Sequence, residues 1–171
     1  MSRKLINHII FIFTAAFLLF SCSQFNSNID EVLDFELTLM ETVDHQNGEK
    51  LILSEYAGTP ILINFWFPSC PPCIAEIPEI NEFYLNNKPN VKVVGVQLVG
   101  FDSLQDGQDF LNNSKVAYAS GADLDGSLIV KYKISGFPTT IFINRKGHIH
   151  QVWQGKITAN KIDEIIKSMG N

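Results

Sequence analysis

The spacing of hydrophobic residues along the chain predicts a short hairpin followed by a buried sheet. Residues 35–39 alternate between apolar and polar positions, as a half-buried strand does. Residues 51–53 follow a turn at Gly48 and form the partner strand. Residues 61–66 and 91–99 are almost continuously apolar. Such runs are typical of strands that are buried on both faces of a sheet.

Apolar residues at helical spacing occur between and after these strands. Residues 71–86 place Ile74 and Ile77 along one side of a helix. Residues 158–169 form an amphipathic terminal helix with Thr158 as its N-cap. The remaining predicted elements are short helices over 104–111 and 127–132, and the strands 139–144 and 149–153 of a terminal hairpin. This order predicts a three-layer α/β sandwich, extended at its N-terminus by the first hairpin.

The first 21 residues differ from the rest and predict an export signal. Arg3 and Lys4 give a positive start, and residues 9–20 contain no charge. That apolar run is short for a transmembrane helix, which needs roughly 20 residues. It fits the apolar region of a signal peptide. An uncleaved membrane anchor over residues 1–21 is the alternative.

The end of this segment, Leu-Phe-Ser-Cys at 19–22, resembles a bacterial lipobox. The resemblance implies that the peptide is removed and that Cys22 becomes a lipid-modified N-terminus. Residues 22–32 are polar and rich in Asn and Ser, as a flexible tether is. We therefore divide the chain into a signal or anchor over 1–21, a polar tether over 22–32 and one domain over 33–171.

Composition narrows the class of binding partner. The 171 residues are enough for one domain with a sizeable core, and 46% of them are hydrophobic. The formal net charge is −5. An acidic balance argues against nucleic acid and against anionic lipid as partners. The sequence therefore indicates one acidic domain behind an export segment.

We expect the chemistry of the chain at Cys70 and Cys73, which enclose Pro71 and Pro72. The pair follows a buried strand and begins a helix, whose positive end stabilises a thiolate. Cys70 is the predicted attacking residue, and Cys73, one turn further in, is the predicted resolving residue. The prolines fit the first helical turn, where an N–H has no helical partner. If Cys22 carries lipid, these two cysteines remain as a pair.

Other uses of a cysteine pair fit the sequence less well. A structural zinc site needs four ligands. His148 and His150 lie far along the chain and are expected as surface residues of a hairpin, so no metal is predicted. Attachment of a c-type haem needs a histidine after the second cysteine, where Ile74 stands. A structural disulfide that closes so small a loop would stabilise the fold little.

Two motifs resemble the active-site segments of the thioredoxin superfamily. The first is Asn-Phe-Trp at 64–66, followed by Cys-Pro-Pro-Cys at 70–73, and the second is Gly-Phe-Pro-Thr at 136–139. The closest branch is the TlpA/ResA-like exported thioredoxins, in which an N-terminal hairpin and a membrane tether are typical. The resemblance covers residues 33–169. It implies a thioredoxin fold with a central mixed sheet flanked by helices.

The same resemblance implies roles for residues around the cysteines. Pro138 would be cis, and Phe137 would offer its backbone to a substrate strand. Trp66 would pack beside the cysteines and contribute to substrate binding. Pro78 would kink the active-site helix. These residues, with Pro71, are the expected surroundings of the reacting sulfur atoms.

Two positions depart from the pattern of the superfamily. Cytosolic thioredoxins hold a buried aspartate, which assists proton transfer, where this chain has Asn64. An asparagine does not titrate, so Glu76, one helical turn after Cys73, is the predicted replacement. An exposed helix glutamate is the alternative interpretation of Glu76. Ser69 stands where the superfamily usually has tryptophan, so the shape of the substrate groove is expected to differ.

Pro71 and Pro72 also bear on the direction of electron flow. Because proline has no N–H, the Cys70 sulfur has fewer backbone donors than in a site without prolines. A less stabilised thiolate favours the disulfide, so the couple is expected to be reducing, although the helix position acts the other way.

The sequence thus predicts an exported, membrane-tethered thiol–disulfide oxidoreductase that reduces disulfides in exported proteins. The resemblance suggests apocytochrome c or copper-site cysteines as substrates and a membrane dithiol as electron donor. The redox-active Cys70–Cys73 disulfide would replace any cofactor. Two alternatives stay open. A thiol peroxidase needs a threonine in the loop that residues 67–70 form, and a copper-binding chaperone usually has a wider cysteine spacing and a partner histidine.

Overall fold

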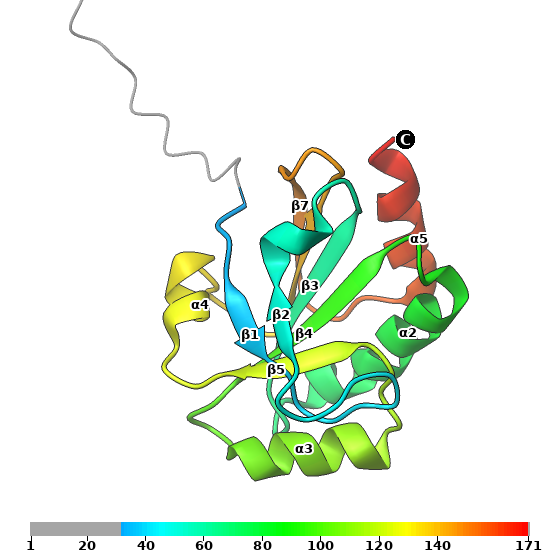
Figure 1. Ribbon diagram of the computed structural model, residues 1–171. Coiled ribbons are helices and arrows are strands. Elements are labelled where there is room, and N and C mark those ends of the chain that lie inside the picture. The colour runs from blue at the N-terminus through cyan, green and yellow to red at the C-terminus, as the bar shows by residue number, and fades with distance from the viewer. Residues whose placement is uncertain (1–31, 171) are drawn as a thin grey trace, which may run out of the picture.

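The computed structural model describes residues 32–170 and contains the strands and helices for which the sequence predicted ranges, together with one further strand, β5 (Figure 1). Two short strands come first, β1 (Glu36–Thr38) and β2 (Lys50–Ile52), followed by a 3-10 turn, η1 (Leu53–Tyr56). The other elements are β3 (Ile61–Trp66), α2 (Pro71–Asn87), β4 (Lys92–Leu98), α3 (Leu104–Asn113), β5 (Ala119–Asp123), α4 (Ser127–Lys131), β6 (Thr139–Ile143), β7 (Ile149–Gln154) and α5 (Ala159–Ser168).

A mixed sheet in the order β5-β4-β3-β6-β7 forms the middle layer. β3, β4 and β5 are parallel, whereas β6 is antiparallel to β3 and β7 is antiparallel to β6. Helices α2 and α5 cover one face, and α4 lies with the β1–β2 hairpin on the other (Figure 1). The predicted three-layer sandwich and its N-terminal hairpin are therefore confirmed.

β3 contributes to both hydrophobic cores. All six of its residues are buried, as its continuous apolar run predicts. Leu62 and Trp66 belong to the core under α2 and α5, while Ile63 and Phe65 belong to the core under the hairpin and α4. The loop that leads to Cys70 therefore starts from the central, fully buried strand of the sheet.

Helix α2 turns the predicted face to the sheet, except at its start, where Ile74 does not lie on the buried side. Ile77 is fully buried as expected, but Ile74 is 38% exposed, and Cys73 and Glu76 lie in the interior instead. Positions 73 and 74 both lie about one turn before Ile77, so apolar spacing alone allowed either. The prediction placed Ile74 on the buried side because it counted only apolar residues, and it considered Glu76 for proton transfer without deciding whether its side chain is buried.

The hairpin contacts β5 at Gly121. Leu39 forms an isolated bridge with Gly121, and the Met40 N–H donates to the Ser120 carbonyl oxygen at 2.8 Å. A Cβ atom on Gly121 would lie 2.5 Å from the Thr38 carbonyl oxygen. The close approach of the two backbones therefore requires glycine at this position.

Gly121→Ala is expected to destabilise the protein by about 1–3 kcal/mol, the usual range for overpacking a well-packed interior. The added methyl group would meet both the Leu37 side chain and the Thr38 carbonyl oxygen, and movement of the side chain alone cannot relieve the contact with the β1 backbone. Urea unfolding followed by circular dichroism measures the change as a lower midpoint. An unchanged midpoint would contradict the close contact between β1 and β5.

The predicted signal over 1–21, the lipid site Cys22 and the tether up to residue 31 lie outside the described residues. Val32 donates its N–H to the Gly147 carbonyl oxygen at 3.2 Å, so the chain enters the domain beside the β6–β7 turn. Within residues 32–170, no helix combines the length and the apolar character needed to cross a membrane.

Candidate active site

Cys70 lies where the chain passes from β3 into α2. It is the N-cap of α2, and its N–H donates to the Phe67 carbonyl oxygen at 3.2 Å. Pro71 and Pro72 occupy the first two helical positions. The Cys73 N–H donates to the Cys70 sulfur at 3.3 Å, and the two cysteines form a disulfide. The structure thus brings the predicted pair together at a helix N-terminus.

The two cysteines differ in access to solvent. Cys70 retains 4% of its surface, whereas Cys73 is fully buried. The difference agrees with attack by Cys70 and resolution by Cys73. Since Pro71 and Pro72 have no N–H, the Cys73 N–H is the first that the helix offers, and it points at the Cys70 sulfur.

The loop before β6 lies at the same end of the sheet as the cysteines. Phe65 on β3 pairs with Thr139 on β6, so Pro138 lies beside the end of β3 that leads into the disulfide. The Phe137–Pro138 peptide bond is cis, as the resemblance implied. Phe137 is half-buried and meets the Phe67 ring edge-on, with 5.2 Å between the ring centroids.

Glu76 is a buried carboxyl group one helical turn from Cys73. Its side chain is fully buried. Oε1 accepts a hydrogen bond from Asn64 Nδ2 at 2.6 Å, and Oε2 accepts one from the Ile157 N–H at 2.9 Å. Burial raises the pKa of Glu76 to about 7, against the opposing effects of the Ile157 and Asn64 hydrogen bonds and the Lys156 charge. Glu76 is therefore not an exposed helix residue, and its pKa lies close to neutral pH.

Asn64 connects Glu76 to the sheet. It is fully buried on β3, and its Nδ2 also donates to Thr140 Oγ1 at 3.1 Å. Thr140 is the partner of Asn64 in the β3–β6 register. Thr140 was not predicted as a site residue; its hydroxyl within a buried strand was the available signal. Because Asn64 does not titrate, Glu76 is the ionisable member of this group.

Trp66 lies behind the disulfide. Its ring is fully buried in the same core cluster as both cysteines, with 5.4 Å between its centroid and that of Phe110. Trp66 was predicted to contribute to substrate binding. Because the ring has no exposed surface, it supports the site from the core side. Pro78 lies inside α2; the kink expected there stays a prediction.

Sequence reasoning missed two residues beside the cysteine pair. One Asp102 carboxylate oxygen accepts hydrogen bonds from the Ser69 N–H at 2.9 Å and from the Ser69 hydroxyl at 2.8 Å. Phe101, next to Asp102, lies 5.1 Å from the Phe67 ring. Both belong to the loop after β4. Parallel strands place their carboxyl ends at one edge of a sheet, and that rule was the available signal.

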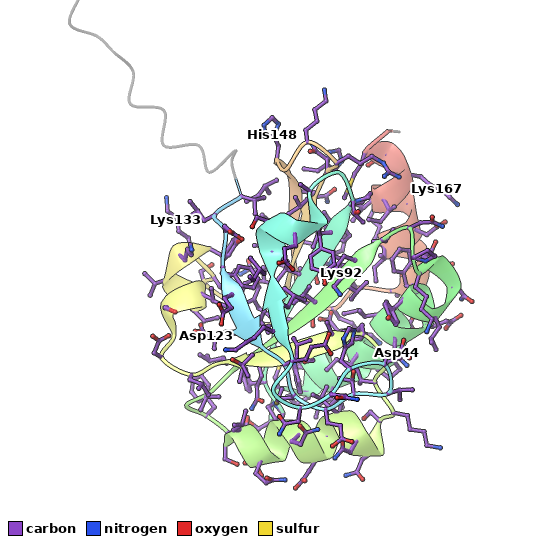
Figure 2. The ribbon with its side chains drawn as sticks, viewed as in Figure 1. Asp44, Lys92, Asp123, Lys133, His148 and Lys167 are labelled. Carbon is purple, nitrogen blue, oxygen red and sulfur yellow. A yellow bond between two sulfur atoms is a disulfide. The ribbon has the colours of Figure 1, made fainter. Side chains whose placement is uncertain are left out.

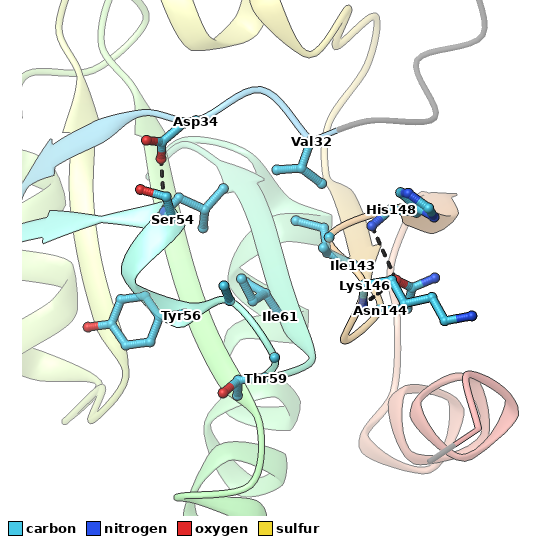
Figure 3. A pocket seen from close by; sticks show the side chains of 14 residues that line it. Val32, Asp34, Ser54, Tyr56, Thr59, Ile61, Ile143, Asn144, Lys146 and His148 are labelled. Carbon is cyan, nitrogen blue, oxygen red and sulfur yellow. Dashed lines mark hydrogen bonds between the residues drawn. The ribbon is translucent and has the colours of Figure 1, made fainter.

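A pocket of about 230 Å³ lies at the other end of the sheet (Figure 3). Val32, Ile61, Ile143 and His148 are among its lining residues. Ile61 begins β3, whereas Cys70 follows the end of that strand. A strand of this length spans about 20 Å, so the pocket is separate from the cysteines.

The two histidines considered as metal ligands are surface residues. His148 projects from the β6–β7 turn (Figure 2), and His150 Nε2 lies 3.0 Å from Ser168 Oγ. In the part of the chain that the structure describes, no three His, Cys, Asp or Glu side chains are grouped to hold a metal ion.

Comparison with known proteins identifies a family and several relatives. Residues 29–152 match the AhpC/TSA family. The thiol-disulfide oxidoreductase ResA of Oceanobacillus iheyensis is 32% identical over 136 residues, which are 78% of this chain and 68% of that protein. The sporulation thiol-disulfide oxidoreductase A of Bacillus subtilis is 32% identical over 128 residues, which are 74% of this chain and 75% of the relative.

Solved structures share the fold. StoA from Bacillus subtilis superimposes with a TM-score of 0.68 at 30% identity, over 78% of this chain and 96% of StoA. A DsbF homologue from Corynebacterium diphtheriae, at 19% identity, has a TM-score of 0.71 over 87% of this chain and 98% of its own. The predicted thioredoxin fold is thus confirmed. The chain belongs to the AhpC/TSA family of the thioredoxin superfamily, among the ResA-like thiol–disulfide oxidoreductases.

Proposed function

We propose that the chain reduces disulfides in exported proteins through the Cys70–Cys73 pair. The observation that carries the proposal is the arrangement of the pair. Cys70 caps α2 and keeps some exposed surface, Cys73 is buried behind it, and the buried Glu76 lies one turn further along. The oxidoreductase relatives support the reaction type.

Reduction of a substrate takes two exchange steps. The Cys70 thiolate attacks one sulfur of the substrate disulfide, which breaks; a mixed disulfide forms, and the other substrate sulfur leaves and takes up a proton. Cys73 then gives its thiol proton to the Glu76 carboxylate while its sulfur attacks Cys70. The mixed disulfide breaks, and the second substrate sulfur leaves and is protonated. Two electrons have then passed from the dithiol to the substrate, and a separate dithiol must reduce Cys70–Cys73 again.

The reduction potential of the full-length protein is expected near the thioredoxin value of about −270 mV. The Cys70 sulfur accepts the Cys73 N–H, and the two prolines add no further donor, so the thiolate is weakly stabilised. Trp66 fluorescence reports the equilibrium between the oxidised and reduced Cys70–Cys73 pair, because the ring lies in the same cluster as the disulfide. The measurement uses buffers with defined ratios of oxidised to reduced dithiothreitol. Pro72→Ala restores one N–H and should raise the potential.

Other results would indicate functions other than disulfide reduction. A value above about −195 mV, midway to the −120 mV of a strong periplasmic oxidant, would indicate an oxidase or isomerase and contradict the proline argument. Rapid consumption of hydrogen peroxide by the reduced protein would identify a thiol peroxidase. Tight, stoichiometric binding of copper, without a reversible disulfide, would identify a copper chaperone.

We also propose that the domain is exported and held at a membrane. The support is the positive start, the apolar run and the Leu-Phe-Ser-Cys at residues 19–22, with Cys22 as the lipid site or 1–21 as an anchor. The tether joins the domain at Val32, beside the β6–β7 turn and remote from Cys70. Electrons would come from a membrane dithiol, and apocytochrome c or copper-site cysteines are the proposed substrates.

A further inference from the structure

We propose that Phe101 selects substrates that carry a bulky apolar side chain beside the reacting cysteine, and that a Ser69–Asp102 hydrogen-bonded pair holds it in place. The inference rests on the proposed reductase function. It adds a specificity-determining residue that lies outside the cysteine and cis-proline motifs. Three observations carry it: the exposure of Phe101, the row of rings to which it belongs, and the hydrogen bonds that fix its loop.

Phe101 is unusually exposed for its type. Its side chain is 73% exposed, and among the exposed large hydrophobic side chains of residues 32–170 it is the only aromatic ring. Single exposed apolar residues are common on protein surfaces and need no function by themselves. The position of Phe101 relative to the disulfide is what gives its exposure meaning.

Phe101 ends a row of three rings that come from three separate loops. Its centroid lies 5.1 Å from that of Phe67, and the centroid of Phe67 lies 5.2 Å from that of Phe137. Phe67 is three residues before Cys70, and Phe137 precedes the cis-proline. Phe67 and Phe137 are half-buried against the core, so the row extends from the core to the exposed Phe101. An apolar surface therefore runs along the edge of the redox site.

The loop of Phe101 is fastened directly to the segment that carries Cys70. Both Ser69 donors, the N–H and the hydroxyl, bind one oxygen of Asp102. Hydrogen bonds to a carboxylate are stronger than neutral ones. Gly100, with a φ of +143°, lets the loop turn back, and its N–H donates to the Asp102 carbonyl oxygen at 3.3 Å. Phe101 is thus held at a fixed place relative to Cys70.

A substrate bound through Cys70 must lie over this surface. In the mixed disulfide, the residues that flank the substrate cysteine are held within a few ångströms of the Cys70 sulfur. Ile74, 38% exposed and one turn after Cys70, adds a further apolar side chain on that helix face. Oδ2 of the Asp102 carboxylate already accepts two hydrogen bonds from Ser69. A leucine or an aromatic residue next to the substrate cysteine fits these neighbours, and a polar residue gains nothing from them.

The test compares three disulfides with the full-length reduced protein. Two are peptides that differ only in carrying leucine or serine beside one cysteine, and the third is hydroxyethyl disulfide, which has no flanking residue. Phe101→Ser is expected to lower kcat/KM for the leucine peptide about tenfold, the scale of one lost apolar contact. The rates with the serine peptide and the small disulfide should change little. Phe101→Leu should keep most of the preference.

Matched variants distinguish substrate selection by Phe101 from a general effect of a surface substitution on activity. Val130 is 78% exposed on α4, at the opposite face of the sheet, so Val130→Ser should leave all three rates unchanged. Asp102→Ala frees the loop and should reduce the preference for leucine in the same direction as Phe101→Ser. No change in preference with Phe101→Ser, or an equal loss with all three disulfides, would overturn the proposal. Failure of the unaltered protein to reduce hydroxyethyl disulfide would instead overturn the reductase function, and this inference with it.

Discussion

Cys73→Ser is expected to trap the protein as a mixed disulfide with its substrate. Cys70 can still attack, but no thiol remains to resolve the product. Turnover should fall by about 10³-fold or more, the scale on which loss of a reacting nucleophile acts. Incubation of the reduced variant with a disulfide peptide, followed by non-reducing electrophoresis and mass spectrometry, measures the adduct at Cys70.

Cys70→Ser is the matched control for this experiment. It should abolish turnover to the same extent and form little adduct, because Cys73 is fully buried behind the N-terminus of α2. An adduct that forms as readily at Cys73 as at Cys70 would reverse the assignment of the attacking residue. Turnover by either single variant close to that of the unaltered protein would remove the dithiol mechanism altogether.

Glu76→Gln is expected to slow disulfide reduction about 10²-fold, the lower range for loss of a general acid–base group. Glu76 has a pKa of about 7, so its carboxylate, which accepts the Cys73 proton in the proposed mechanism, forms as the pH rises through 7. The rate of the unaltered protein should therefore rise through about pH 7, and that step should be absent in the variant. Stopped-flow measurement of kcat/KM from pH 5 to 9 tests both expectations.

The same substitution should change the pH dependence of stability. The carboxyl has an ordinary pKa of 4.5 and a folded-state pKa of about 7, so between these values the folded protein binds a proton that the unfolded chain does not. The contribution of Glu76 is therefore most favourable below pH 4.5 and is lost as the pH rises to 7. One pKa unit corresponds to about 1.4 kcal/mol, so the loss is about 3 kcal/mol. The Glu76→Gln variant should not show this loss of stability between pH 4.5 and pH 7.

Comparison of the two oxidised proteins isolates Glu76. The pKa values of Asp34 and Asp44 are lowered by hydrogen bonds from Ser54 and Lys88, and these groups contribute the opposite dependence at lower pH. They are present in both proteins and cancel in the difference between urea unfolding curves at pH 5 and pH 8. Glu82→Gln, on the exposed side of α2, is the control and should behave as the unaltered protein. A difference that does not vary with pH would show that Glu76 titrates normally.

The order of most elements and the position of the cysteine pair could be predicted from the sequence. Strand β3 was predicted from its apolar run, since a strand that is buried on both faces is apolar at nearly every position. The Cys-Pro-Pro-Cys segment predicted a dithiol at a helix start, because proline and the N-cap act within one turn. These features are local, so a short window of residues contains what decides them.

The groups that surround the dithiol depend on tertiary packing. The packing turned Glu76 inward, where the sequence also allowed an exposed position, and it joined Glu76 to Asn64 and Ile157 from distant parts of the chain. Burial of the carboxyl, and hence its raised pKa, follows from that packing. The contacts of Phe101 also depend on how the loops after parallel strands meet at one edge of the sheet. Contacts between distant segments, and the burial that they cause, produce no periodic pattern of residues in the sequence. They are therefore visible only in the folded structure.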